Sequence, residues 1–283
     1  MKHIVKILTV LIMIIPVSEI LAQGGVTEAP NHDVFERTEN ENREALDYVH
    51  VREADVMWHK TIWRRIDMRQ KFNMPFYYPF QPKNGRKNFM TIVKEAISQG
   101  EITVYATKIG NDHFSEPLSI EEAMASFQDS TEVTRLNENN EEYIKRIAEE
   151  ANMQDIYELD IKEQWFIDRE RSVLDVRIIG ISPVWYKPGR EGEEPQPDRM
   201  FWIYYPDARD VFINSPVYNR ENDAKRLTYE DLFAKRMFDS YIYKESNVYD
   251  RAISDYALGM EALLEAKRIK EEVREREMNL WEY

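Results

Sequence analysis

Residues 51–79 read VREADVMWHKTIWRRIDMRQKFNMPFYYP, and this stretch decides how the first half of the chain is expected to fold. Its apolar side chains recur at three- and four-residue steps: Val51, Ala54, Trp58, Ile62 and Ile66. That spacing places them on one face of an α-helix. Pro75 is expected to end the helix, because proline lacks a backbone N–H and disfavours helical geometry at the preceding residue. The stretch therefore predicts an amphipathic helix followed by a turn.

Cationic side chains flank the predicted apolar stripe. They are Lys60, Arg64, Arg65, Arg69 and Lys71. A basic helix on an acidic chain would polarise the subunit, and polarised subunits can stack head to tail through electrostatic complementarity. A solvated helix face is the simpler interpretation of the same residues, so the sequence leaves both open.

Aromatic residues follow the helix as a dense run, Phe76-Tyr77-Tyr78-Pro79-Phe80. Tyrosine, tryptophan and arginine are enriched among residues that dominate the energy of protein interfaces. The candidate interface residues are therefore Trp63, Arg64, Tyr77 and Tyr78. Core packing explains most of the other aromatic residues, because alternate side chains of an aromatic strand must face inward.

The run ADVMWHKTIWRRIDMRQKFNMPFYYP (residues 54–79) resembles the signature of the GldN/PorN family, a periplasmic component of type IX secretion and gliding motility in Bacteroidetes. Two later blocks carry the same resemblance in the expected order: FWIYYPDARDVF (201–212) and LTYEDLFAKRMFDSYIYKESN (227–247). The resemblance covers essentially the whole chain that follows the first segment. It implies a structural protein rather than an enzyme.

The resemblance also implies partners. It suggests self-association into a periplasmic ring, binding to an outer-membrane lipoprotein of the GldK/PorK type, and contact with the periplasmic part of a GldM/PorM-type motor protein. It implies no cofactor and no small-molecule substrate. The expected location is the periplasm, on the inner face of the outer membrane.

The first segment has the pattern of a secretory signal peptide. Lys2 and Lys6 precede an apolar run over residues 7–17, and small residues follow. The run is shorter than the roughly 20 residues that span a bilayer. Cleavage is expected between Ala22 and Gln23. The chain contains no cysteine, so lipid attachment through that residue and disulfide bonds are both excluded.

The composition is that of a globular chain, with 43% hydrophobic and 32% charged residues and a net charge of −14. Such a charge disfavours nucleic acid, because phosphate binding requires a basic patch. It also disfavours attachment to anionic lipid by charge alone.

The expected fold class is α+β, with a helical N-terminal part, a mostly antiparallel β region in the second half and a long C-terminal helix. The predicted organisation is a signal peptide (1–22), a flexible arm (23–42), a helix-rich subdomain with the aromatic docking segment (43–128), a linker (129–140), a β-rich subdomain (141–247) and the C-terminal helix (248–283).

Several elements can be placed within this organisation. Helices are expected over 89–98, 120–127, 141–151, 229–238 and 249–278, and strands over 102–107, 163–168, 173–181, 200–205 and from 210. Ser119 with Glu122, and Thr228 with Asp231, are capping pairs at the starts of two of these helices. The proximal half of the last helix carries a coiled-coil-like seam, consisting of Tyr249, Ile253, Tyr256, Met260 and Leu263, and is expected to pack on the body.

Catalytic signatures are absent from the sequence: it has no HExxH, GxSxG or glycine-rich phosphate loop. The five histidines lie far apart, without the spacing of metal ligands. Acidic pairs such as Asp207 and Asp210 leave one alternative open, an exported cell-wall glycoside hydrolase or carbohydrate-binding protein.

Overall fold

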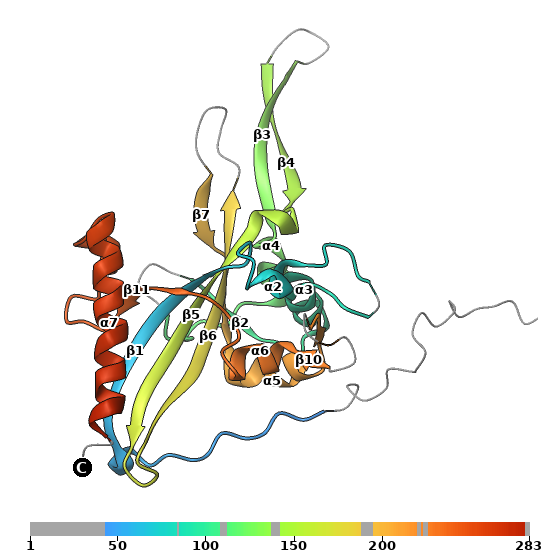
Figure 1. The fold of residues 1–283 in the computed structure, drawn as a ribbon. Coiled ribbons are helices and arrows are strands. Elements are labelled where there is room, and N and C mark those ends of the chain that lie inside the picture. Colours follow the sequence, from blue (N-terminus) through green and yellow to red (C-terminus); the bar gives the residue numbers. More distant parts are fainter. Residues whose placement is uncertain are drawn as a thin grey trace, which may run out of the picture. The chain divides into compact units, whose positions relative to one another are not determined.

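The computed structural model (Figure 1) describes residues 43–83, 85–107, 112–136, 142–187, 195–219, 222 and 226–280, with backbone alone over 129–136 and 142–150. The predicted signal peptide, its Ala22/Gln23 cleavage site and the arm over 23–42 lie outside these residues. The described part combines helices with an antiparallel sheet, so the predicted α+β class is confirmed.

A seven-stranded sheet forms the centre of the structure. Its strands are β1 (Val56–Asp67), β2 (Val104–Tyr105), β5 (Ile156–Asp168), β6 (Val173–Lys187), β7 (Gln196–Arg199), β8 (Trp202–Tyr204) and β11 (Tyr241–Glu245). The order is β11-β1-β5-β6-β8-β2, with β7 also paired to β6 and every pair antiparallel. Two small pairs complete the strands: β3 (Gln128–Leu136) with β4 (Glu142–Glu150), and β9 (Pro216–Val217) with β10 (Leu227–Thr228).

The helices fall into two groups. The first comprises α2 (Met74–Tyr77), α3 (Phe89–Gln99), α4 (Ile120–Ala125), α5 (Tyr205–Ile213) and α6 (Tyr229–Ala234). These helices pack around the larger of two buried apolar clusters. The second group is α7 (Met260–Asn279), which lies beside β1 and β11 (Figure 1). Single 3-10 turns, named η, occur at η2 (Glu53–Asp55), η3 (Met153–Asp155) and η4 (Ile253–Asp255).

One face of the sheet carries both apolar clusters. Ile62, Arg64 and Ile66 alternate along β1 and therefore point to the same side. Ile66 belongs to the larger cluster, whereas Ile62 belongs to the smaller cluster under α7. Between them Arg64 forms an ion pair with the buried Glu163 of β5. A buried charge pair thus separates the part of the sheet under α2–α6 from the part under α7.

Helix α3 follows its predicted bounds closely. The Asn88 side chain accepts a hydrogen bond from the N–H of Thr91, which caps the helix start. Gly100 ends the helix in the left-handed conformation that glycine adopts without steric cost. The two predicted capping boxes, at Ser119 and Thr228, are also confirmed.

The prediction of a helix over the opening stretch is wrong, because this segment is strand β1. Trp58, Ile62 and Ile66 are four residues apart, a spacing that suits one face of a helix and, being even, also one face of a strand. The tryptophans and β-branched residues in this segment favour the strand. Pairing with β5 along nearly the whole length of β1 decides the outcome. Pro75 does not end a helix but lies in the first turn of α2.

Two other local predictions are wrong. Residues 141–151 form strand β4 rather than a helix, and pair with β3, which includes much of the predicted linker. Residues from 210 belong to helix α5, not to a strand, because the helix already begins at Tyr205 with Pro206 in its first turn. The division of the chain at 129–140 stays a prediction, although β1 on one side of it pairs with β5 and β11 on the other.

The C-terminal helix begins at Met260, later than predicted, and packs through its other half. Of the predicted seam, Tyr249, Met260 and Leu263 are 62–74% exposed and Tyr256 is 44% exposed, whereas Ile253 is buried in the cluster under α7. Ile269 and Val273 in the distal half are instead buried against the sheet. Charged neighbours support this contact, because Glu272 approaches Lys60 of β1 at 3.4 Å. Ala262 and Ala266 of the same helix, both partly buried, also pack against this cluster.

Replacing Ile269 by alanine should therefore lower the free energy of unfolding by about 2–5 kcal/mol, because the side chain is fully buried. Leu263→Ala, at an exposed position of the same helix, should change it by less than about 0.5 kcal/mol. Urea unfolding followed by tryptophan fluorescence measures both. Equal, small losses of unfolding free energy in the two variants would show that α7 does not pack through its distal half.

The capping box of α6 should make stability depend on pH. Burial alone would raise the pKa of Asp231, but hydrogen bonds from Lys235 and Thr228 outweigh it and hold the pKa below its usual value. The ionised carboxylate thus stabilises the folded protein above about pH 4, the value for unfolded chains. This contribution is lost as the pH falls through the lower folded-state pKa. Asp231→Asn should therefore lower Tm at pH 7, and the difference from wild type should vanish in acid.

Candidate protein-docking surface

Helix α2 is fixed to the body by its neighbours on both sides. The buried Asn73 side chain donates hydrogen bonds to the carbonyl oxygens of Asp67 and Asp239 and accepts one from the N–H of Asp239. Phe76 is 1% exposed and packs against Phe89, Tyr229 and Phe233 in the larger cluster. One side of α2 is therefore an anchor, and the residues after it are held at the surface.

The aromatic run continues outward from this anchor. Tyr77, Tyr78 and Phe80 contact one another with ring centroids 4.4–5.4 Å apart. The Tyr77 hydroxyl donates to the carbonyl oxygen of Gln154 at 2.9 Å, and partial burial raises its pKa. Tyr78, in contrast, is 48% exposed. The cluster thus presents a rigid aromatic surface with Tyr78 as its accessible member.

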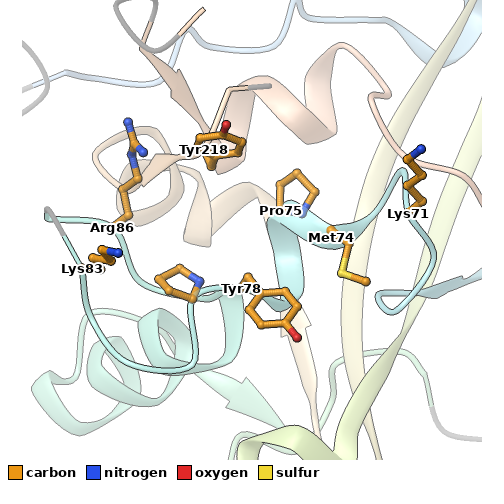
Figure 2. A pocket seen from close by; sticks show the side chains of 8 residues that line it. Lys71, Met74, Pro75, Tyr78, Lys83, Arg86 and Tyr218 are labelled. Atoms are coloured by element: carbon orange, nitrogen blue, oxygen red, sulfur yellow. The ribbon is translucent and has the colours of Figure 1, made fainter. Parts of the chain in front are cut away.

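Beside Tyr78 lies a pocket of about 540 Å³, which we call the basic pocket (Figure 2). It is lined by Lys71, Met74, Pro75, Tyr78, Pro79, Lys83, Arg86 and Tyr218. Its walls are apolar or aromatic, and the three cations stand apart around them, Lys71 from one side and Lys83 with Arg86 from the other (Figure 2). The Arg86 guanidinium also lies 5.4 Å from the centre of the Tyr218 ring.

The lysines of this pocket differ from the other cations of the opening stretch. Lys60, Arg64, Arg65 and Arg69 all pair with carboxylates. Neither Lys71 nor Lys83 forms an ion pair with a residue that the structure describes. On a chain of net charge −14 these are local sites of positive charge beside apolar walls. Such a pocket is suited to a segment that carries apolar and acidic side chains together.

Two of the four candidate interface residues lie inside the sheet instead. Trp63 is 7% exposed, and its indole N–H donates to Asp112 at 2.8 Å. Arg64 is 9% exposed and donates to Glu163 at 3.0 Å, and burial lowers the pKa of its guanidinium while Glu163 opposes that effect. As adjacent strand residues they point to opposite faces. The structure therefore brings Tyr77 and Tyr78 together, and places Trp63 and Arg64 elsewhere.

A second buried charge cluster lies on the sheet face opposite Arg64. Asp160 of β5 is fully buried and accepts hydrogen bonds from Arg65 of β1 and Arg199 of β7, both at 2.6 Å. Nearby, Tyr186 of β6 donates to Glu158, and burial together with this carboxylate raises the tyrosine pKa. These contacts tie four strands together, and the sequence alone gives no signal for them because Asp160 and Arg199 are distant along the chain.

One residue of the acidic pair that suggested enzyme chemistry, Asp210, has a structural contact. Asp210 on α5 accepts a hydrogen bond from the N–H of Ala45, which holds the extended segment before β1. Within the described residues, no three histidine or acidic side chains gather where they could bind a metal ion. Nor does that part of the chain contain a helix long and apolar enough to cross a bilayer.

The fold and the surface together define an α+β protein with a rigid aromatic and basic pocket suited to holding another polypeptide. Residues 51–282 match the model of the family described as gliding motility associated protein GldN. The chain therefore belongs to the GldN family, as its opening stretch predicts, and is a component of the gliding-motility and type IX secretion machinery. A comparison with curated protein sequences found no match.

Trp63 and Tyr78 should respond differently to truncation. Trp63→Ala removes a buried ring and a hydrogen bond, and should lower the free energy of unfolding by about 3–5 kcal/mol. Tyr78→Ala acts at a half-exposed position and should cost less than about 1 kcal/mol. Chemical denaturation of the two purified variants measures both. Comparable losses would contradict the placement of Tyr78 on an accessible surface.

Proposed function

We propose that this chain is a non-enzymatic structural subunit of a periplasmic ring in the gliding and type IX secretion machinery. In this proposal it binds an outer-membrane lipoprotein of the GldK/PorK type and associates with further copies of itself. The observation that carries the proposal is the family match over residues 51–282, joined to a surface whose chemistry is that of a protein interface.

The features of the surface support a docking role in three ways. Tyr78 projects from a segment that Phe76 and Asn73 fix in place, so little side-chain and loop entropy is lost on binding. The pocket joins aromatic walls to cations, the combination that is enriched at interface hot spots. Lys71 and Lys83 form no ion pair with a residue that the structure describes, and could meet carboxylates of a partner.

The proposal extends to place and partners. The predicted signal peptide, with its basic residues and short apolar run, supports a periplasmic location beneath the outer membrane. Because the chain belongs to the GldN family, we propose the periplasmic part of a GldM/PorM-type motor protein as a further partner. The protein would contribute surfaces and would need no cofactor.

Co-expression with the GldK/PorK-type lipoprotein, followed by size-exclusion chromatography and negative-stain imaging, tests the proposal. We expect large closed particles that contain both chains. Tyr77→Ala combined with Tyr78→Ala should weaken assembly, because the accessible aromatic surface is lost, while the circular dichroism spectrum of the isolated subunit is retained. Ile120→Ala, at a 49% exposed apolar position on α4, is the matched control and should assemble normally.

Two results would contradict these statements. A monomer that elutes beside an unbound lipoprotein would overturn the structural role, and would direct attention to the alternative of cell-wall binding or hydrolysis. Normal assembly of the double tyrosine variant would show that the aromatic surface is not part of the interface.

A further inference from the structure

We propose that the basic pocket of one copy receives an acidic, apolar projection from a second copy of the same chain. The projection, which we call the acidic knob, lies where η4 leads into α7. It consists of Asp255, Tyr256, Leu258, Met260, Glu261 and Leu264. The inference deepens the proposed self-association, on which it rests, by assigning the two surfaces that meet.

The knob exposes more apolar surface than an isolated subunit can explain. Leu258 is 77% exposed, Met260 is 70% exposed and Leu264 is 59% exposed. Large apolar side chains gathered on one surface mark sites of interaction with other proteins. Single exposed apolar residues are common on protein surfaces. These three lie close together in the sequence, in the turn at Gly259 and the first turns of α7.

The backbone holds the knob in a defined shape. Gly259 adopts a φ of 58°, a conformation that side chains disfavour, and the chain turns sharply there between Leu258 and Met260. Directly before this turn, Ile253 and Ala257 are buried in the cluster under α7. The exposed side chains therefore stand on an anchored base.

The charges of the knob complement those of the basic pocket. Glu261 forms no ion pair with any residue that the structure describes, and it sits in the first turn of α7. Asp255 accepts hydrogen bonds from the N–H of Ala252 and the hydroxyl of Ser254, and forms no ion pair with a residue that the structure describes. Lys71 and Lys83 of the pocket likewise form no ion pair with a residue that the structure describes, and they stand beside apolar walls. Apolar side chains would enter the pocket while acids meet cations at its rim.

One copy can offer both surfaces at once. The pocket is built on α2, whose Phe76 belongs to the larger apolar cluster, and the knob stands on the smaller cluster under α7. Figure 1 shows α7 beside β1 and β11, apart from the group that contains α2. A contact between two different surfaces is head to tail, so every added copy exposes a new knob or a new pocket. Such contacts generate closed rings or filaments rather than two-fold dimers.

Cross-linking between copies tests the pairing directly, because the chain has no native cysteine. One copy would carry Lys83→Cys and the other Glu261→Cys, both co-assembled with the lipoprotein and treated with a short bis-maleimide. We expect a covalent dimer that contains one copy of each variant. Pairing Glu261→Cys with Ser98→Cys, an exposed position on α3, is the control and should give no dimer.

Charge reversal supplies a second, independent readout. Lys71→Glu with Lys83→Glu should raise the concentration needed for assembly by about tenfold, since like charges then oppose each other across the contact. Asp255→Lys with Glu261→Lys should have a similar effect. Combining all four changes in one chain should restore assembly, which a merely structural role of these residues would not predict.

The outcomes separate this inference from the proposed function. If the Lys83→Cys and Glu261→Cys variants form full-size particles without the cross-link, and charge reversal leaves assembly unchanged, the pairing is overturned and the structural role stays intact. Loss of the lipoprotein alone from the Lys71→Glu/Lys83→Glu variant would show that the pocket binds that partner instead. Failure of the wild-type chain to assemble at all would overturn the proposed function.

Discussion

The fold depends on two carboxylate side chains of strand β5 that lie buried inside the protein beside arginine side chains. Asp160 and Glu163 are both completely buried on opposite faces of the sheet. The neighbouring residues Arg64 and Arg65 of β1 supply one cation to each face. Arg199 and Arg236 complete the two clusters from distant parts of the chain. A buried charge without its partner is strongly destabilising, so these pairs accept only one register between β1 and β5. That register also positions everything attached to β1, including α2.

Much of the fold can be predicted from local sequence signals, where these act within one element. Asn88 and Gly100 delimit α3 through backbone caps, and the pair Thr228 and Asp231 marks the start of α6. These contacts join residues three or four positions apart, so they can be recognised from the local sequence. The strands 163–168 and 173–181 were also predictable, because β-branched and aromatic residues surround a short turn.

Prediction from the sequence fails where contacts with a distant part of the chain determine the secondary structure or the burial of a residue. Trp58, Ile62 and Ile66 satisfy the period of a helix and that of a strand, and only pairing with β5 distinguishes them. Tyr78 could be recognised as an interface candidate because tyrosine is enriched at interface hot spots and lies here in a dense aromatic run. Trp63 and Arg64 looked equivalent to it by residue type, yet burial in the sheet separates them from it. Tyr218 joins the pocket from a position 140 residues after Tyr78, a proximity that no local pattern reveals.

The clamp made by Asn73 has a mechanical consequence. Its side chain joins the end of β1, at Asp67, to Asp239, two residues before β11 begins. A pull on the α2 surface therefore reaches the central strands at both of these points. Because β1 lies between β5 and β11, backbone hydrogen bonds on both of its sides oppose a displacement of this strand. Asn73 thus couples the position of α2 to both β1 and β11, two adjacent strands of the central sheet.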